Sequence, residues 1–524
     1  MNRNFYNIAL AVIFSVLAGS GMAQERYLQE VFTGVEVTAD VPFALNISVL
    51  TGTPAPVELF CDVYQPAGDT ETERPLILVA HTGSFLPPLF NGGTTGARSD
   101  SVVVETCKRL ARQGFVAAAY TYRLGWLPES DDQNIRTGTL LQAAYRGVQD
   151  TRSAVRFFRK TVAEDGNPYG IDPEKIGIWG IGTGGYLSAG AATLDRWEEV
   201  TLEKFINSVT FQPFVDSTLL GNLYGTTEKP LCLPNHVEYS DDIAIALNMG
   251  GAIGDTAWLE GNIVPPMLGY HCLRDPFAPF NYGPVIVPTT GDFVVFVSGT
   301  RQMVEISNNY GYNDVLKDIP ASVDPIQQIV EIFKTVDVTL PGDVTIKLGT
   351  DNMYPFITEG FESGPWDWWS KPQLDIIVSL TNQALGTDFN ADTLHNNGLL
   401  TNPGMSKEKA SAYLDTIFLY SSPRICAALD LGCGFTSSVE ELDPSEVGFS
   451  FGPNPASDRI EIRTDAEFPI EHVSMYDLNG RLVLKHIDVN ESRFGFQVGH
   501  LTPGMYLMKT EFEKGILNEK ILIH

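Results

Sequence analysis

The sequence is poor in positive charge. Its 524 residues include 35 lysines and arginines against 64 aspartates and glutamates, which gives a formal net charge of −29. Proteins that bind nucleic acid place clustered basic side chains against the phosphates. The composition therefore argues against nucleic acid as a partner.

Cysteine is scarce as well, with six in the whole chain. No two of them form a C-x-x-C pair and no histidines have the spacing of a metal-binding motif, so we predict neither a metal site nor a cofactor. In an exported chain an even number of cysteines permits disulfides. Cys426 and Cys433, which enclose a short loop with Leu431-Gly432, are the pair that we expect to be bonded. Buried free thiols remain the alternative.

Long apolar runs are missing beyond the N-terminus, where no stretch is long enough to cross a bilayer. The N-terminus has Arg3, an apolar segment at 8–17 and small residues at Gly21-Met22-Ala23. This order is typical of a secretory signal peptide. We therefore predict a signal peptide at residues 1–23 and a soluble mature protein without a transmembrane span.

Strand-like and helix-like segments alternate through the first 200 residues. Continuous apolar runs occur within 74–85, 115–126 and 175–180, and amphipathic stretches separate them at 101–114 and 142–165. Apolar strands that alternate with helices indicate a parallel sheet covered on both faces. The predicted fold class is α/β.

A glycine-rich turn follows the last of these strands. Residues 176–190, IGIWGIGTGGYLSAG, have the pattern of a nucleophile elbow, in which a serine stands between two glycines as G-x-S-x-G. Here the pentapeptide is Gly180-Ile181-Gly182-Thr183-Gly184, and Gly182 holds the serine position. Small residues at 180, 184 and 185 are what the tight turn requires, so we predict that the turn persists without its nucleophile.

Three motifs in order make residues 57–194 resemble the secreted carboxylesterase and lipase branch of the α/β-hydrolase family. His81-Thr82-Gly83-Ser84-Phe85 resembles the HGGGF loop of that family, Tyr122-Arg123-Leu124-Gly125 resembles its YRLG motif, and residues 169–176 resemble the approach to the elbow. The resemblance implies an α/β-hydrolase fold, a mostly parallel sheet with helices on both faces. It also implies that backbone amides of Gly83, Ser84 and Thr183 form an oxyanion hole.

The other parts of a catalytic triad are only partly present. A serine hydrolase needs a hydroxyl, a histidine and a carboxylate. Gly182 cannot attack, and Thr183 is the alternative nucleophile, although we expect its side chain to point away. Asp275, which precedes Pro276, is the candidate acid, with a simple turn residue as the alternative. His395 is the candidate base, because it alone follows Asp275 within the hydrolase-like region, and a surface position is the alternative.

An aromatic cluster falls in residues 355–373, PFITEGFESGPWDWWSKPQ. Aromatic faces line clefts for sugars and apolar ligands, and they also fix long loops onto a domain. Both interpretations stay open, and either fits a cap-like or long-loop insertion. The cluster consists of Phe356, Phe361, Trp366, Trp368 and Trp369.

The C-terminal part has a different character. An acidic linker at 437–448 precedes short alternating strands at 449–524, which predict a small all-β sandwich. This tail resembles the type A C-terminal sorting domain of the bacterial type IX secretion system. The resemblance implies a Bacteroidetes-type cell, the type IX machinery as a partner, and a protein that is secreted or attached to the outer surface. The matching residues are Pro453-Asn454-Pro455-Ala456, Tyr476-Asp477, Asn479-Gly480-Arg481, Leu501 and Pro503-Gly504-Met505-Tyr506.

These observations leave enzymatic activity open. The hydrolase-like domain, residues 24–436, implies a carboxylesterase-like hydrolase, but Gly182 removes the standard serine mechanism. One hypothesis is a secreted ester hydrolase that works by Thr183 or by another arrangement. Another is a non-catalytic pseudo-hydrolase that binds a small-molecule or polymeric ester-like ligand. A third is an inactive variant of a working esterase.

Overall fold

The computed structural model describes residues 26–260, 264–358, 360–433, 440–478, 482–487, 489–512 and 515–524. The predicted signal peptide and the Asn479-Gly480 turn lie outside these residues. Among the described helices, none is both long and apolar enough to cross a membrane.

The core of the molecule is an eight-stranded sheet with the order β1-β2-β4-β3-β5-β6-β8-β13. The pairs β1–β2 and β2–β4 are antiparallel, and the six strands from β4 to β13 run parallel. The strands are β1 (Val35–Ser48), β2 (Ala55–Pro66), β3 (Arg74–Ala80), β4 (Val116–Tyr120), β5 (Ile171–Ile181), β6 (Ile245–Met249), β8 (Met267–Cys272) and β13 (Met353–Phe356).

The inner strands explain why the sheet forms. Every residue of β3, β4, β6, β8 and β13 is buried. Such continuous apolar runs suit strands that are covered on both faces, whereas a sheet with one wet face alternates polar and apolar residues. The predicted α/β class with a mostly parallel sheet is confirmed.

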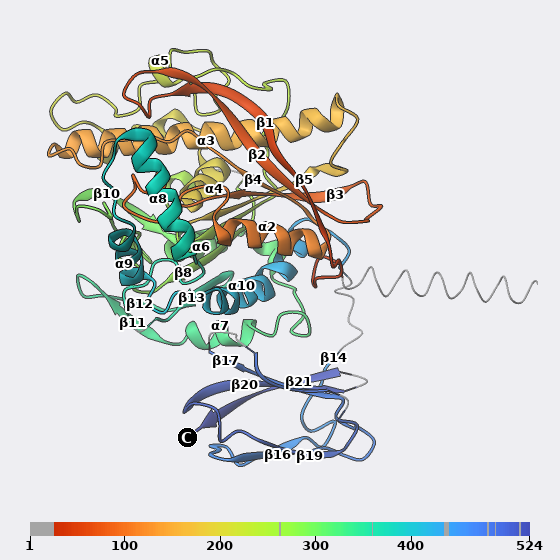
Figure 1. Ribbon diagram of the computed structural model, residues 1–524. Coiled ribbons are helices and arrows are strands. Elements are labelled where there is room, and N and C mark those ends of the chain that lie inside the picture. The colour runs from red at the N-terminus through yellow and green to blue at the C-terminus, as the bar shows by residue number, and fades with distance from the viewer. Residues whose placement is uncertain are drawn as a thin grey trace, which may run out of the picture.

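Helices cover both faces of this sheet (Figure 1). On one face α2 (Ser101–Gln113) lies beside α10 (Lys407–Ala428), to which Arg109 Nη1 of α2 donates a bond at 2.6 Å to Asp415 Oδ1. On the other face lie α3 (Gln133–Ala163), α4 (Thr183–Thr193) and α6 (Thr300–Asn309). Thr300 joins α6 to the loop after β6 by donating to Gly251 O at 2.9 Å.

In the hydrolase-like domain, smaller elements lie between and after the strands of the large sheet. A helix pair, α8 (Lys371–Leu385) and α9 (Ala391–Thr401), follows β13. The remaining elements are α5 (Ser217–Leu220), β7 (Ala252–Ile253), β9 (Tyr282–Ile286), β10 (Phe293–Gly299), α7 (Gln327–Phe333), β11 (Asp337–Leu340), β12 (Val344–Lys347) and the single-turn helices Trp197–Val200, Glu203–Phe205, Thr256–Leu259 and Asp314–Leu316.

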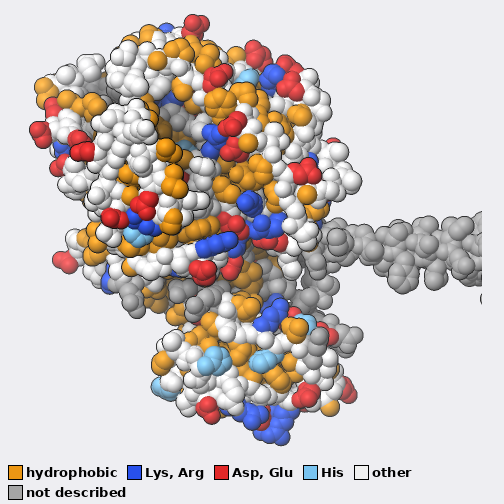
Figure 2. All heavy atoms as spheres, viewed as in Figure 1, with side chains coloured by type: hydrophobic (Ala, Val, Ile, Leu, Met, Phe, Trp, Pro, Cys, Tyr) orange, Lys and Arg blue, Asp and Glu red, His pale blue; other side chains and the backbone are white. Residues whose placement is uncertain are grey.

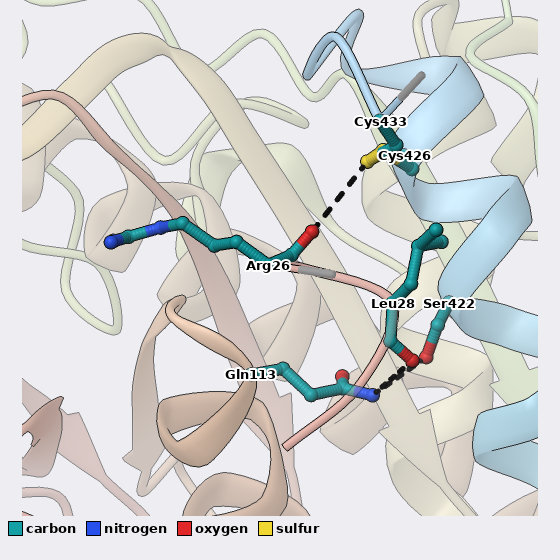
Figure 3. Close-up of a disulfide and its surroundings, with 6 residues drawn as sticks. All are labelled: Arg26, Leu28, Gln113, Ser422, Cys426 and Cys433. Carbon is teal, nitrogen blue, oxygen red and sulfur yellow. Dashed lines mark hydrogen bonds between the residues drawn. A yellow bond between two sulfur atoms is a disulfide. The ribbon is translucent and has the colours of Figure 1, made fainter. Parts of the chain in front are cut away.

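The disulfide prediction is confirmed, because Cys426 and Cys433 are bonded at the end of α10. Cys433 Sγ lies 4.0 Å from the carbonyl oxygen of Arg26, at the start of the described chain (Figure 3). Beside it, Gln113 Nε2 of α2 donates to Ser422 Oγ of α10 at 2.9 Å. The bridge therefore stands where three segments that are distant in sequence meet. The other cysteines, Cys61, Cys107, Cys232 and Cys272, are free and buried.

The C-terminal strands form a separate β-structure below α7 in Figure 1. A five-stranded sheet has the order β14-β21-β20-β17-β18, and a three-stranded sheet has the order β15-β16-β19. They enclose their own apolar core, which includes Ile460, Met475 and Ile521. The strands are β14 (Glu440–Glu441), β15 (Ser450–Gly452), β16 (Arg459–Arg463), β17 (His472–Asp477), β18 (Leu482–His486), β19 (Arg493–Gln497), β20 (Gly504–Phe512) and β21 (Gly515–Ile523).

Candidate functional site

The candidate site lies at the carboxyl ends of the parallel strands. Loops that follow parallel strands meet at the same edge of an open sheet, which is where such sheets bind their ligands. The loops after β3, β5, β8 and β13 contribute Thr82, Gly182, Asp275 and Trp366 to one cavity of about 210 Å³. Residues from four separate stretches of the sequence are thus brought to one place.

The turn between β5 and α4 keeps the geometry of a nucleophile elbow. Gly182 has φ 53° and ψ −114°, a conformation that strains any residue with a side chain. A Cβ on Gly180 would overlap with the carbonyl oxygen of Gly184, and a Cβ on Gly184 would overlap with that of Ala80. The prediction that small residues hold this turn is confirmed.

Thr82 occupies the space that a serine side chain would need. A Cβ placed on Gly182 would overlap with Thr82 Oγ1 and would lie 2.9 Å from Thr82 Cβ. The HGGGF loop that this segment resembles has glycine at the position of Thr82. Because glycine carries no side chain, the hydroxyl of Thr82 and the missing side chain of Gly182 are complementary changes. Neither motif indicates this pairing when it is taken alone.

The predicted oxyanion loop is bonded to the threonine of the elbow. The backbone N–H of Ser84 donates to Thr183 Oγ1 at 2.7 Å. The Thr183 hydroxyl therefore lies against this loop, and Thr183 is one of the residues that line the cavity. The carbonyl of Ser84 accepts from Trp126 Nε1 at 2.6 Å. Gly83 is not among the described residues that line the cavity, and its carbonyl accepts from Asn91 Nδ2 at 3.2 Å. The Ser84 amide is thus already used within the protein.

Asp275 lines the cavity and also shapes its own turn. Its Oδ1 accepts from the backbone amides of Phe277 at 2.8 Å and Ala278 at 3.0 Å. Its side chain is 3 % exposed, and His271 Nε2 lies 3.7 Å from its Oδ2. Burial raises the pKa of Asp275 to about 7 and lowers the pKa of His271 to about 4. Asp275 thus holds its own turn and also lines the cavity, and its role as the acid of a triad stays a prediction.

The structure does not bring His395 to the cavity. His395 lies in α9, where its Nδ1 accepts from Trp369 Nε1 at 3.0 Å. It is absent from the described residues that line the cavity. The residues of the aromatic cluster do not all reach the cavity either. Trp366 lines it, whereas Trp369 is bonded to His395 of the helix pair and Phe361 is 67 % exposed.

A second acid at the cavity escaped the sequence analysis. Triad members on this type of sheet follow the chain order serine, acid, histidine. The loop after β13 comes third in that order, and the titratable residue that it places at the cavity is Asp367. Asp367 Oδ1 is buried without a hydrogen-bond partner. Burial, together with the charge of Asp100, raises the pKa of Asp367 to about 8. The sequence signal that could have identified Asp367 was its position in the loop after the last strand of the sheet.

The YRLG-like motif supports the scaffold and not the cavity. Arg123 Nε contacts Asp150 Oδ2 at 2.9 Å, and both side chains are fully buried. The ring of His81 stacks on Tyr122 with centroids 4.4 Å apart, and burial lowers the pKa of His81 to about 4. These contacts fix the loop that carries Thr82 and Ser84.

Most of the remaining cavity wall is apolar, although Tyr145, Tyr186 and Ser363 also line it. It comes from α3, α4, β10 and the loops around them, so most of the surface offered to a ligand is hydrocarbon. The described residues hold no group of three or more His, Cys, Asp or Glu side chains arranged for a metal ion. The principal apolar lining residues are Phe85, Trp126, Leu140, Leu141, Val148, Ile181, Leu194, Phe205, Trp258, Phe277, Val295, Val297 and Trp366.

Two family models match the chain. One is described as "Secretion system C-terminal sorting domain" and matches residues 451–524, and the other, described as BD-FAE, matches residues 61–230. No curated protein matches.

Solved structures that match the chain include forms of esterase 2 from Thermogutta terrifontis. The form phosphoramylated by tabun is 16 % identical over 70 % of this chain and 100 % of that chain, with a TM-score of 0.31. A native form is 16 % identical over 67 % of this chain and 93 % of that chain, with a TM-score of 0.30. The form phosphonylated by cyclosarin is 21 % identical over 48 % of this chain and 75 % of that chain, with a TM-score of 0.27.

The strand order and the two family matches lead to one assignment. The molecule has an esterase-like α/β-hydrolase domain followed by a type IX secretion sorting domain. The resemblance to this family, predicted from the HGGGF-like loop, the elbow and the tail motifs, is confirmed.

Proposed function

We propose that this protein is a secreted α/β-hydrolase-fold module that binds a small, mainly apolar ligand without serine-dependent ester hydrolysis. One observation carries the proposal: the hydroxyl of Thr82 fills the space of the missing serine side chain at Gly182. A loss of the nucleophile alone would leave a gap at this point, whereas here the neighbouring loop has closed it.

Two further changes at the cavity support the same conclusion. The Ser84 amide donates to Thr183 Oγ1, so an oxyanion would have to displace an existing bond. The loop after β13 offers a carboxyl group, Asp367, where the chain order of the triad would place a histidine. An apolar cavity with a few convergent polar groups persists, and that is the form of a ligand site.

A second candidate function rests on Thr82 itself. Its hydroxyl lies almost where the serine would be, so Thr82 is a potential displaced nucleophile. In that mechanism Thr82 Oγ1 would attack the ester carbonyl and pass its proton to a cavity carboxylate. The ester C–O bond would then break, and the alcohol would leave with that proton. Water would finally hydrolyse the acyl-threonine and restore the Thr82 hydroxyl. This candidate predicts ester turnover that depends on one hydroxyl.

Hydrolysis of p-nitrophenyl butyrate separates the two candidates. We would compare the purified full chain with Thr82→Val, which removes the hydroxyl and keeps the shape of the side chain. The binding module predicts no turnover above background in either protein. Turnover that the full chain shows and Thr82→Val loses would establish the threonine mechanism and overturn the first proposal.

A stability measurement tests the geometry behind both candidates. Gly182→Ser introduces a side chain that collides with Thr82, so we expect it to lower the melting temperature. The double variant Gly182→Ser/Thr82→Gly removes the collision and should recover part of the loss. A Gly182→Ser protein as stable as the parent chain would show that Thr82 does not fill this space.

Export is the other part of the proposal. Residues 1–23 act as a signal peptide, residues 24–436 form the ligand-binding domain, and residues 449–524 direct the chain to the type IX machinery after the linker at 437–448. The sorting-domain match supports this route. Deletion of residues 449–524 in the producing cell should leave the protein inside the outer membrane. Unchanged release into the medium would argue against it.

A further inference from the structure

A lysine amine lies beside a side-chain carboxamide where the chain passes from α9 to α10. Lys409 is in the first turn of α10, and Asn402 directly follows the last residue of α9. Lys409 Nζ is 2.9 Å from Asn402 Oδ1 and 2.8 Å from Glu362 Oε2. None of the three belongs to the described residues that line the cavity. An amine, a carboxamide and a carboxylate thus meet at one point outside the site described above.

All three groups are largely withdrawn from solvent. The side chain of Glu362 is 9 % exposed, that of Lys409 is 20 % exposed, and Asn402 as a whole is 4 % exposed. The amine also donates to the carbonyl oxygen of Pro403 at 2.7 Å. An ion pair with little water around it has lost much of its hydration, and transfer of one proton from the ammonium to the carboxylate removes both charges. Glu362 can therefore convert Lys409 into the neutral amine that nucleophilic attack requires.

The carboxamide of Asn402 is fixed from its other side. Its Nδ2 donates to the carbonyl oxygens of Gly364 at 3.0 Å and of Asp367 at 2.8 Å. A carbonyl bond is about 1.2 Å long, so Asn402 Cγ lies within about 4 Å of Lys409 Nζ. Atoms that are ready to react are about 3 to 3.5 Å apart, and a fixed carboxamide beside a fixed amine needs little movement to reach that separation.

We propose that Lys409 and Asn402 form an isopeptide bond, an amide between their side chains, with Glu362 as the base. Glu362 takes a proton from the ammonium, and the neutral Nζ attacks Asn402 Cγ. The Nζ–Cγ bond forms and the Cγ–Nδ2 bond breaks. Two protons pass in all from Nζ to Nδ2 through Glu362, so the Asn402 nitrogen leaves as ammonium and Glu362 ends as a carboxylate. The reaction requires no oxidant or other co-reactant.

The cross-link fixes one wall of the cavity. Glu362 directly precedes Ser363 and Gly364, which line the cavity. Asn402 holds the carbonyl groups of Gly364 and Asp367. A covalent bond from Asn402 to α10 therefore limits the movement of this loop. Unlike the disulfide at the other end of α10, the amide does not open in a reductant. The inference is independent of which ligand the cavity binds.

The mass of the purified full chain tests the proposal. After reduction of the disulfide, loss of one ammonia should lower the mass by about 17 Da relative to the sequence. Trypsin then locates the loss, because other side chains can also lose ammonia. It cleaves after lysine, so the fragment that contains Asn402 ends at Lys407 and the next begins at Glu408. We expect these two fragments to stay joined, with no cleavage after Lys409, and fragmentation in the mass spectrometer should place the join at Asn402 and Lys409.

Glu362→Gln and Lys409→Met identify the reacting groups. Glutamine keeps the shape of the glutamate side chain but cannot act as the base, and methionine keeps the apolar length of lysine without its amine. Neither variant should contain the joined fragments. The matched control is Lys334→Met, because Lys334 Nζ bonds to the carboxylates of Glu331 and Asp351 at 3.0 and 2.8 Å. This control should retain the loss of about 17 Da.

The parent chain provides the decisive measurement, so a variant that fails to fold does not affect it. If trypsin separates the two fragments of the parent chain and cleaves after Lys409, the three groups form an ion pair with a hydrogen bond, and the proposal is wrong. Joined fragments that persist in Glu362→Gln would overturn the role of Glu362 as the base.

Discussion

Single residues explain how the elbow can survive without its serine. The strained backbone of Gly182 and the close contacts of Gly180 and Gly184 belong to the turn itself and persist. The neighbouring changes concern side chains alone: Thr82 enters the space of the nucleophile, and Thr183 bonds to the Ser84 amide. The molecule therefore keeps the backbone geometry of the elbow without its catalytic side chains. For this reason the sequence motifs predict the turn better than they predict the chemistry.

Buried titratable residues make the stability of this protein depend on pH in an unusual direction. Asp100 and Asp275 hold their protons up to about pH 7 and Asp367 up to about pH 8, whereas unfolded aspartates lose theirs near pH 4. Above pH 4 the folded state thus binds more protons, and the free energy of unfolding falls by about 1.4 kcal/mol per pH unit for each such group.

Two buried histidines oppose this trend at lower pH. The pKa of His81 and of His271 is lowered to about 4, so between pH 4 and 6.5 the unfolded state takes up protons that the folded state does not. The two histidines therefore make the free energy of unfolding rise with pH between pH 4 and 6.5, and they add no further change above pH 6.5. The decline due to the acids should therefore be steepest between about pH 6.5 and 7, and Asp367 alone continues it to about pH 8.

Urea unfolding at pH 5, 6.5 and 8 measures this dependence. We expect the free energy of unfolding to fall from pH 6.5 to 8 in the parent chain and to fall less in Asp275→Asn and Asp367→Asn. The control Asp343→Asn, in the exposed turn between β11 and β12, should follow the parent chain. A stability that rises over this interval would show that these carboxyl groups ionise in the folded protein.

At the scale of the elements, the sequence predicted the sheet well and the cavity poorly. The buried strands could be identified because their apolar runs are local in sequence, and the elbow glycines because the turn is local as well. Asp367 and Thr82 become functional candidates only when the loops after β13 and β3 meet β5, a contact between segments far apart in the chain. His395 shows the opposite failure, since its chain order suited a base but α9 holds it against Trp369.

The end of α10 offers a prediction about one element. The bond between Cys426 and Cys433 closes a short loop beside the segment at Arg26. The double variant Cys426→Ser/Cys433→Ser should lower the free energy of unfolding by about 2 kcal/mol, as expected for a short loop. A reductant should destabilise the parent chain and leave the double variant unchanged, because the remaining cysteines are free.

Thiol titration under denaturing conditions gives an independent check of that bond. The parent chain has six cysteines, so one disulfide leaves four that react. Six reactive thiols in the unreduced protein would mean that the bridge is absent, and two would mean that a further pair has formed.

At the scale of the whole molecule, surface charge agrees with the composition. On the face shown in Figure 2, lysine and arginine side chains stand in small groups among acidic and hydrophobic ones. They form no broad basic patch on that face, which agrees with the net charge of −29.

The sorting domain rests on the hydrolase-like domain through a small contact. Leu507 of β20 is 3 % exposed and packs into the core of the hydrolase-like domain, while Tyr354 Oη donates to the carbonyl oxygen of Leu478 at 2.5 Å. Lys509 Nζ adds a bond to Ser322 O at 3.4 Å. Because the tail has its own apolar core, we infer that it remains folded when this contact is broken.

Leu507→Glu tests whether the two domains separate in this way. A buried carboxylate at the contact should release the tail, because the charge gains water only when the domains part. We expect a larger radius of gyration in X-ray scattering and a separate unfolding transition for the tail, with binding of octan-1-ol, a small apolar probe for the cavity, unchanged because Leu507 is not part of the cavity wall. Leu522→Glu is the matched control, since Leu522 is 40 % exposed on the neighbouring strand β21 and should alter neither property. A Leu507→Glu protein as compact as the control would mean that the contact does not hold the domains together, and loss of ligand binding would mean that docking of the tail shapes the cavity.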